Sequence, residues 1–225
     1  MITDIPDDFI CGFLKYHPIE YLESFQNGIL HCNSIQNFTK LDPLDGRGDK
    51  YEYVVKQTFG KSAVLDLIHG DLAVTHIEGI RIREDYYQYN YYNRDFYANL
   101  FCLYAITTKN PKPVNPNELP ERLMQMGTHV LVIYNSIEFV TRVKKALTKS
   151  NLEYQMRLVE YLDLYNHEGS KSFFQKPLRY SYQQEYRIMI KNTCEQVLKL
   201  DIGSIKDISE ILPSEKLKRT KVIYY

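Results

Sequence analysis

Residues Phe173–Ile190 read FFQKPLRYSYQQEYRIMI, and this stretch decides which fold is expected. From Gln183 onward its side chains alternate with period two, which predicts a strand that begins near Gln184. The apolar side chains that share one face of this strand are Tyr186, Ile188 and Ile190. We therefore expect that face to pack against a hydrophobic core.

The opposite face of the same strand carries Glu185 and Arg187 at the strand's start. A carboxylate in that position can be presented to a cleft. The alternative is a solvated face on which the two side chains form a weak ion pair, worth about 0–1 kcal/mol. The alternation alone fits both interpretations.

The chain has 225 residues, of which 44% are hydrophobic and 25% charged, close to ordinary globular usage. We expect a single domain over 1–225, because no linker or internal repeat divides the sequence. No apolar run reaches the ~18–20 residues that span a bilayer. The first eight residues are acidic where a signal peptide would be basic and then apolar, so we expect a cytoplasmic protein with no membrane partner.

Basic and acidic residues each total 28, so the formal net charge is zero and no general attraction to nucleic acid is expected. The chain is tyrosine-rich, with 20 Tyr, 10 Phe and no Trp, a composition that suits aromatic-lined clefts. Its cysteines lack metal-ligand or redox spacing, and we expect buried, reduced thiols at Cys11, Cys32, Cys102 and Cys194.

The pattern along the chain predicts an α+β domain with a mixed, strand-rich sheet and a few helices. A first helix over 18–27 should start at Pro18 and end at Gly28. A second over 137–148, N-capped by Asn135-Ser136, should carry Arg142 on a solvated face. Strands are expected over 9–17, 29–34, 50–55, 98–108, 129–134 and 157–165, and short strands or turns over 197–202, 207–212 and 222–225. A hairpin is expected over 61–82, a turn over 35–38 and loops over 42–49 and 110–120.

Residues 85–97 read DYYQYNYYNRDFY and contain six tyrosines. We expect a Tyr-rich loop packed on the sheet. The alternative is a stacking platform for single-stranded nucleic acid, helped by the nearby Arg81, Arg83 and Arg94.

The common catalytic motifs are absent: no phosphate-binding Gly-rich loop, no dinucleotide fingerprint, no zinc-protease helix and no nucleophile elbow. The six histidines show no pair at helical i, i+4 spacing, so no metal site is expected. The absence of these motifs disfavours the usual kinases, Rossmann dehydrogenases, zinc proteases and serine hydrolases.

The order of the remaining signals resembles the ADP-ribosyltransferase superfamily. A first strand ends in Lys15-Tyr-His17, a short helix ends at Gly28, and a late strand opens with Gln183-Gln-Glu185. Several short pieces look like an uncharacterised bacterial and phage group suspected of having that fold: Ser34–Phe38, Arg47–Glu52, Phe101–Tyr104, Phe174–Lys176 and Tyr182–Arg187.

The resemblance implies an ADP-ribosyltransferase-like split sheet and NAD as substrate, without a metal. Glu185 would be the catalytic glutamate and Gln183 an upstream partner that helps to choose the acceptor. On the first two strands, His17 or Tyr16 and then Ser34 would contact NAD. The sequence departs from the fullest family pattern, because it has no clear Ser-Thr-Ser triplet and leaves the first-strand role open among Lys15, Tyr16 and His17.

The implied activity is ADP-ribosyl transfer or NAD hydrolysis. Cleavage of the nicotinamide–ribose bond develops oxocarbenium character, which an ionised carboxylate stabilises. Aromatic side chains that would stack on nicotinamide are Tyr16, Tyr180 and Tyr182. Cations that would meet the pyrophosphate are Arg47, Lys176 and Arg187.

The sequence does not identify the acceptor, which is a protein, a nucleic acid, a small molecule or water. The alternative function is a non-catalytic nucleotide- or nucleic-acid-binding module of the same fold. The resemblance to phage proteins also suggests a toxin or a defence role in phage–host conflict.

Overall fold

The computed structural model describes residues 9–40, 54–60, 63–69, 73–80, 87–92, 97–108, 123, 125–163 and 169–217. In these ranges the chain is a mixed, strand-rich α+β structure with few helices, as the sequence predicts. The expected segments 42–49, 110–120 and 222–225 lie outside the described residues. No helix within the described ranges is both long and apolar enough to span a lipid bilayer.

The first strand, helix and second strand form as predicted: β1 (Ile10–His17), α1 (Ile19–Gln26) and β2 (Ile29–Ser34). Pro18 is the N-cap of α1 rather than its first residue, because its ψ of 150° is extended. Gly28 ends the turn with a φ of +106°, and a Cβ there would collide with the carbonyl group of Gly203. This close approach positions α1 and β2 against the chain's last third.

The main sheet has eight strands in the order β14-β2-β7-β1-β8-β15, with β13 and β9 added beyond β7. Its later strands are β7 (Tyr97–Thr107), β8 (His129–Ile133), β9 (Tyr154–Leu158), β13 (Glu185–Asn192), β14 (Leu198–Asp201) and β15 (Ser209–Pro213). β7 is the central strand buried on both faces that its apolar run predicts.

One edge of β7 is shared by two strands, and this splits the sheet. β13 pairs with β7 along Tyr97–Tyr104, so β1 and β2 must occupy the opposite edge. On that edge β1 pairs up to Tyr104, and β2 pairs with Asn99 and Leu100. Residues 101–103 lie in the gap, matched with neither strand, while β1 continues beside β8 to His17. The divergence of β1 from β2 opens the sheet here.

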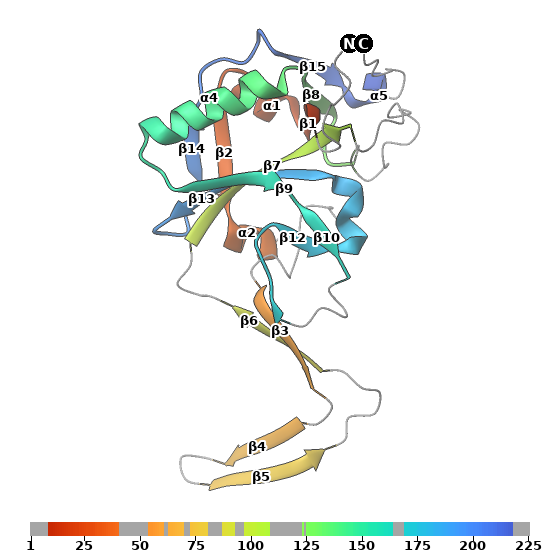
Figure 1. Ribbon diagram of the computed structural model, residues 1–225, viewed down its shortest axis with the longest axis vertical. Coiled ribbons are helices and arrows are strands. Elements are labelled where there is room, and N and C mark those ends of the chain that lie inside the picture. The colour runs from red at the N-terminus through yellow and green to blue at the C-terminus, as the bar shows by residue number, and fades with distance from the viewer. Residues whose placement is uncertain are drawn as a thin grey trace.

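The two faces of the sheet are covered differently (Figure 1). Helices α1 and α4 (Ser136–Lys149) cover one face, where Phe25, Phe139 and Ile188 belong to the largest hydrophobic cluster. Tyr186, Ile188 and Ile190 lie in this cluster, as the alternation predicts. The other face carries α2 (Ile35–Lys40), β10 (Glu160–Leu162), β12 (Gln175–Pro177) and the 3-10 helix η3 (Leu178–Gln183). It also has two smaller clusters, around Tyr104 and around Leu100.

The segment between β2 and β7 forms sheets of its own. β3 (Val54–Gly60) pairs with β6 (Tyr87–Tyr92) and with β11 (Gly169–Ser170), and β4 (Ala63–His69) pairs with β5 (Ala73–Ile80) as the predicted hairpin. The loop predicted for the Tyr-rich stretch is wrong over Tyr87–Tyr92, which is a strand, because alternating tyrosines also suit cross-strand pairing. The rest of that stretch, except Tyr97 at the start of β7, and the three arginines near it lie outside the described residues.

Other predictions need smaller corrections. The turn expected over 35–38 is the helix α2, which Ser34 starts by accepting a hydrogen bond from the Asn37 amide. The strand expected over 157–165 is divided between β9 and β10. Cys32 is buried as expected, but Cys11 and Cys102 are half-buried and Cys194 is exposed. Cys194 lies just beyond the end of β13, which is Asn192, so no strand covers it.

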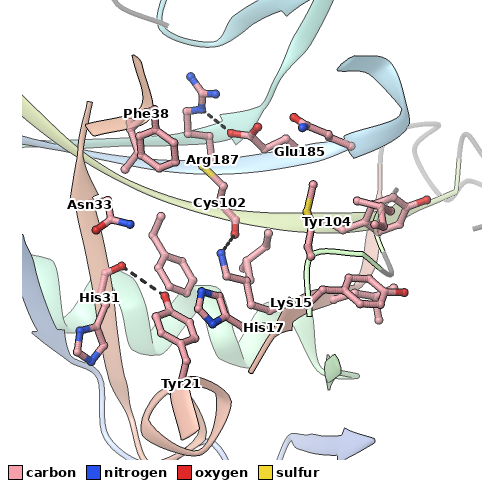
Figure 2. A pocket seen from close by; sticks show the side chains of 18 of the residues that line it. Lys15, His17, Tyr21, His31, Asn33, Phe38, Cys102, Tyr104, Glu185 and Arg187 are labelled. Carbon is pink, nitrogen blue, oxygen red and sulfur yellow. Dashed lines mark hydrogen bonds and ion pairs between the residues drawn. The ribbon is translucent and has the colours of Figure 1, made fainter. Parts of the chain in front are cut away.

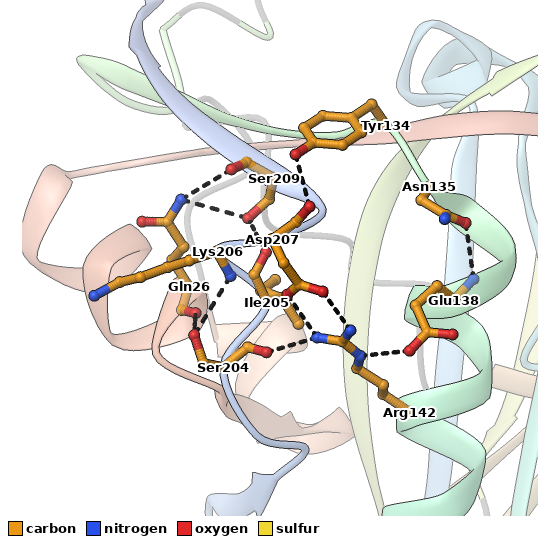
Figure 3. Close-up of polar contacts among 10 residues, drawn as sticks. All are labelled: Gln26, Tyr134, Asn135, Glu138, Arg142, Ser204, Ile205, Lys206, Asp207 and Ser209. Atoms are coloured by element: carbon orange, nitrogen blue, oxygen red, sulfur yellow. Dashed lines mark hydrogen bonds and ion pairs between the residues drawn. The ribbon is translucent and has the colours of Figure 1, made fainter.

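Arg142 does not lie on a purely solvated face. Its guanidinium donates to both carboxylate oxygens of Asp207, at 2.8 and 2.6 Å, and to the Ser204 carbonyl and Glu138 (Figure 3). These bonds tie α4 to the turn before β15. Asn135 caps the helix as predicted, since its Oδ1 accepts from the Glu138 amide at 3.0 Å.

Candidate functional site

A pocket of about 230 Å³ opens where the sheet splits. Its residues come from both sides of the gap and from the covering segments: Lys15 and His17 of β1, Asn33 of β2, Cys102 of β7, and Glu185 of β13. Figure 2 shows Glu185 and Arg187 at one end and His17, Tyr21 and His31 at the other, with Lys15 and Cys102 between them. Segments far apart in the sequence thus meet in one cavity.

Glu185 is 5% exposed and lies between two cations. Its Oε1 accepts from Arg187 Nε at 2.6 Å, and its Oε2 accepts from Lys176 Nζ at 2.8 Å. Arg187 is fully buried and also donates to the Phe173 carbonyl, while Lys176 donates to Gln183 Oε1 at 2.9 Å. The solvated-face alternative is therefore wrong: these charges form a buried network that lines the pocket.

The network keeps Glu185 ionised. Burial alone would raise the pKa of its carboxyl group, but the charges of Arg187 and Lys176 outweigh burial and hold the pKa well below its ordinary value. Two cations and one carboxylate leave this group with a net positive charge. A buried net charge favours an anionic partner.

Gln184 aims its two neighbours into the pocket. It is the C-cap of η3 and has left-handed backbone angles, φ 37° and ψ 51°, which are uncommon for a residue other than glycine. Its carbonyl accepts from the Ala105 amide at 2.8 Å, which anchors the turn to β7. Because the chain changes direction there, Gln183 and Glu185 both reach Lys176.

Lys15 occupies the split itself. Its Nζ donates to the Cys102 carbonyl at 2.8 Å and lies 4.9 Å from the centre of the Phe101 ring. Cys102 is one of the β7 residues that neither β1 nor β2 pairs with. A side-chain ammonium therefore takes a position that a neighbouring strand would otherwise occupy, and it places a third cation in the pocket wall.

An aromatic group forms the far end of the pocket. The rings of His17 and Tyr21 stack with their centres 3.7 Å apart, and the Tyr21 hydroxyl donates to the His31 carbonyl at 3.4 Å. Burial, and the charge of Lys199, lower the pKa of His31, which keeps that ring neutral at pH 7. This end offers flat aromatic surface and few charges.

Tyr16 also lines the pocket, but on its apolar side. Its side chain belongs to the cluster around Tyr104 and is 5% exposed. Within the described ranges its hydroxyl has no hydrogen-bond partner. Burial, and the nearby Tyr104, raise the pKa of this hydroxyl, so it is neutral and able to donate at pH 7.

The structure brings seven of the eleven site candidates named from the sequence to this pocket: Lys15, Tyr16, His17, Lys176, Gln183, Glu185 and Arg187. Gln183 is 8% exposed and held by Lys176, so its side chain faces the pocket rather than a surface where an acceptor would dock.

The other four predicted residues do not line the pocket as described. Ser34 is buried and starts α2, while its neighbour Asn33 lines the cavity. Tyr180 is buried under Lys176 and Arg179, and Tyr182 packs against the Tyr104 cluster, so the irregular η3 turns both rings away from the pocket lining. Arg47 lies outside the described residues.

Several lining residues were not singled out from the sequence, among them Tyr21, His31, Asn33, Cys102 and Tyr104. Cys102 and Tyr104 alternate along β7 and lie opposite Arg187 and Glu185 in register. Period two within the apolar run would have placed these four on one face, had the pairing of β7 with β13 been known. Burial and Glu185 raise the pKa of the Cys102 thiol, so it is protonated at pH 7.

Across the described ranges, no group of three or more His, Cys, Asp or Glu side chains is placed to hold a metal ion. The described wall of the pocket combines cations at one end with stacked aromatic rings at the other.

Comparison with known proteins identifies no relative: no family model matches the chain, and neither a curated protein nor a solved structure matches it.

Proposed function

We propose that this pocket binds NAD in an ADP-ribosyltransferase-like arrangement, and that the protein transfers ADP-ribose or hydrolyses NAD. One observation carries the proposal. An acidic side chain at the start of a late strand lines the same pocket as polar side chains of the first two strands, at a split in the sheet. The family resemblance requires this convergence of Glu185 with the ends of β1 and β2.

The reaction needs one fixed negative charge. The bond between ribose C1′ and the nicotinamide nitrogen breaks, and its electron pair leaves with the nitrogen. The developing positive charge at the ribose is stabilised by the ionised Glu185, whose position Arg187 and Lys176 hold. An acceptor hydroxyl, amine or water then attacks C1′ and releases its proton to solvent.

The cations suit the rest of the ligand. Among the described lining residues Lys15, Lys176 and Arg187 are cationic and Glu185 is the one acid, a balance that favours a pyrophosphate. The pocket is small beside the ~300–1,000 Å³ of sites that enclose drug-sized ligands. It would therefore enclose the nicotinamide riboside half of NAD, with the adenosine half toward the opening.

A second candidate is a nucleotide-binding module without turnover. It is favoured by the two ion pairs of Glu185, because both carboxylate oxygens already have cationic partners at 2.6 and 2.8 Å. In that case Glu185 would neutralise the pocket rather than act on the ribose.

Replacing the carboxylate separates the two functions. We expect Glu185→Gln to lower the rate of nicotinamide release from labelled NAD at least about a hundredfold, the scale of losing a key electrostatic group. Glu153→Gln is a matched control, because Glu153 pairs with Lys191 on the exposed surface. If the protein binds NAD but Glu185→Gln and Glu153→Gln release nicotinamide at the same slow rate, Glu185 is not catalytic and the protein is a binding module.

Glu185→Gln leaves two buried cations without a counter-charge, which costs about 3–5 kcal/mol when a buried pair is broken. A second comparison removes this difficulty. Lys176→Met keeps the Glu185–Arg187 pair, and adding Glu185→Gln restores the original net charge of the group. Both variants should retain the fold by circular dichroism. Because Lys176 helps to hold Glu185, we expect Lys176→Met to release nicotinamide more slowly than wild type, and the double variant to be at least about a hundredfold slower than Lys176→Met. A measurable rate in Lys176→Met that is unchanged in the double variant would remove Glu185 from the mechanism.

A further inference from the structure

The charges around Glu185 do not balance. Its carboxylate is one negative charge, whereas Arg187 Nε at 2.6 Å and Lys176 Nζ at 2.8 Å belong to two positive charges. All three side chains are more than nine-tenths buried, so salt and water screen them weakly. A cationic centre that approaches Glu185 would therefore meet a group whose net charge is positive.

This imbalance opposes the proposed reaction. Cleavage of the nicotinamide–ribose bond builds positive charge at C1′, and a net positive group next to the ribose raises the energy of that transition state. A substrate that carries phosphate corrects the imbalance, because its anionic oxygens pair with the same cations. A substrate without phosphate leaves the carboxylate cancelled.

Of the two cations, Lys176 is better suited to exchange its partner for a phosphate. Arg187 is fully buried and also donates to the Phe173 carbonyl, so its planar guanidinium is fixed on two acceptors. Lys176 lines the pocket and carries a compact charge on a flexible four-carbon stem. Its three N–H donors rotate together, and they already serve two acceptors, on Glu185 and Gln183.

We propose that Lys176 makes turnover depend on the substrate's own phosphate, so that the protein cleaves phosphorylated nicotinamide ribosides and spares nicotinamide riboside. This inference rests on the proposed function and gives Lys176 a role in specificity beyond holding Glu185. When a phosphate pairs with Lys176, the charge of Glu185 is no longer cancelled and acts on the ribose. Without phosphate, the ion pair restrains the carboxylate.

The experiment measures nicotinamide release, as kcat/KM, from NAD, nicotinamide mononucleotide and nicotinamide riboside. Two variants remove the charge of Lys176. Lys176→Met removes its donors as well, whereas Lys176→Gln keeps N–H donors for Glu185 and Gln183 and so protects the fold. Lys191→Met is the matched control, because Lys191 pairs with Glu153 at 2.7 Å on the exposed surface. Melting temperatures are compared for all the variants.

We expect wild type and Lys191→Met to cleave the two phosphorylated substrates at least about a hundredfold faster than nicotinamide riboside, because phosphate contributes both binding and charge balance. Both Lys176 variants should be slower than wild type on NAD. On nicotinamide riboside they should be about tenfold faster than wild type, which corresponds to a barrier lower by ~1.4 kcal/mol. A purely structural role of Lys176 would lower both rates, so the opposite signs identify the effect.

Two results would overturn the inference while leaving the proposed function intact. One is a wild type that cleaves NAD while neither Lys176 variant gains activity on nicotinamide riboside. The other is a wild type that cleaves nicotinamide riboside as fast as NAD. A wild-type protein that releases no nicotinamide from NAD would overturn both proposals.

Discussion

Glu185 illustrates how a buried carboxylate is kept charged. Its environment is nearly dry, which by itself favours the neutral acid, and the two neighbouring cations reverse that preference. The same contacts make Arg187 tolerable in the core, since an unpaired guanidinium there would be very costly. Stability and the proposed chemistry therefore depend on one network.

This network predicts a specific pH dependence. The folded-state pKa of Glu185 is lowered from 4.5, so its stabilising effect is complete above that pH and is lost as the pH falls further. Glu185→Gln resembles the protonated state. We expect wild type to melt well above Glu185→Gln at pH 7 and the difference to shrink steadily below about pH 4.5. A difference that stays constant from pH 7 to pH 3 would contradict this account of the carboxylate.

At the scale of elements, the turn between α1 and β2 carries a strict steric requirement. Gly28 and Gly203 both have positive φ, at +106° and +75°, but only a Cβ at Gly28 would meet backbone atoms. The turn holds β2 beside β14, because the Ile202 amide donates to the Gly28 carbonyl at 2.9 Å. The position of β2, and with it one side of the pocket, depends on this contact.

The two glycines form a matched pair for mutation. Gly203→Ala should cost only the left-handed backbone strain, about 1–2 kcal/mol. Gly28→Ala adds a collision with the Gly203 carbonyl and should cost about 2–5 kcal/mol in the free energy of unfolding, summing strain and overpacking. Urea unfolding of both variants measures the difference. Equal losses of unfolding free energy in the two variants would show that the turn can shift to accommodate a Cβ at Gly28 without further destabilisation.

At the scale of the molecule, the pocket and the arm formed by β3, β4, β5 and β6 are separate features. Within the described residues, these strands hydrogen-bond among themselves and to the two-residue β11. Every lining residue that the structure describes lies outside the arm. Figure 1 draws β4 and β5 beyond β3 and β6, away from the main sheet.

Removing the arm should therefore spare the site. Val54 and Tyr92 are register partners, so an Asn-Gly turn can join them in place of residues 55–91. We expect the shortened protein to fold and to bind NAD within about threefold of the full chain, because a factor of ten would require ~1.4 kcal/mol of lost contacts. Loss of NAD binding by a folded, shortened protein would mean that the arm takes part in the site.

Much of the fold could be predicted from local patterns. The period-two alternation after Gln183 gave the core face of β13, and Gly28 and Asn135 marked helix ends that the structure confirms. Patterns failed where tertiary contacts decide: tyrosines at 87–92 form a strand, and Arg142 is tied to Asp207 across 65 residues of sequence. The sequence pointed to Ser34, but the side chain that lines the pocket is the neighbouring Asn33. Side chains of a strand alternate between its two faces, so an error of one position selects a residue on the wrong face.

By itself, the sequence determined which side chains share a strand face and where helices begin and end, because these depend on neighbours a few residues apart. It placed Glu185 and Arg187 on one face but left open whether that face meets water. Only the tertiary structure decided that β1 and β2 share one edge of β7, that Lys176 reaches Glu185, and that the Tyr16 hydroxyl is buried with no partner among the described residues. The physical reason is that strand edges and buried charges find their partners through long-range packing, which no local periodicity encodes.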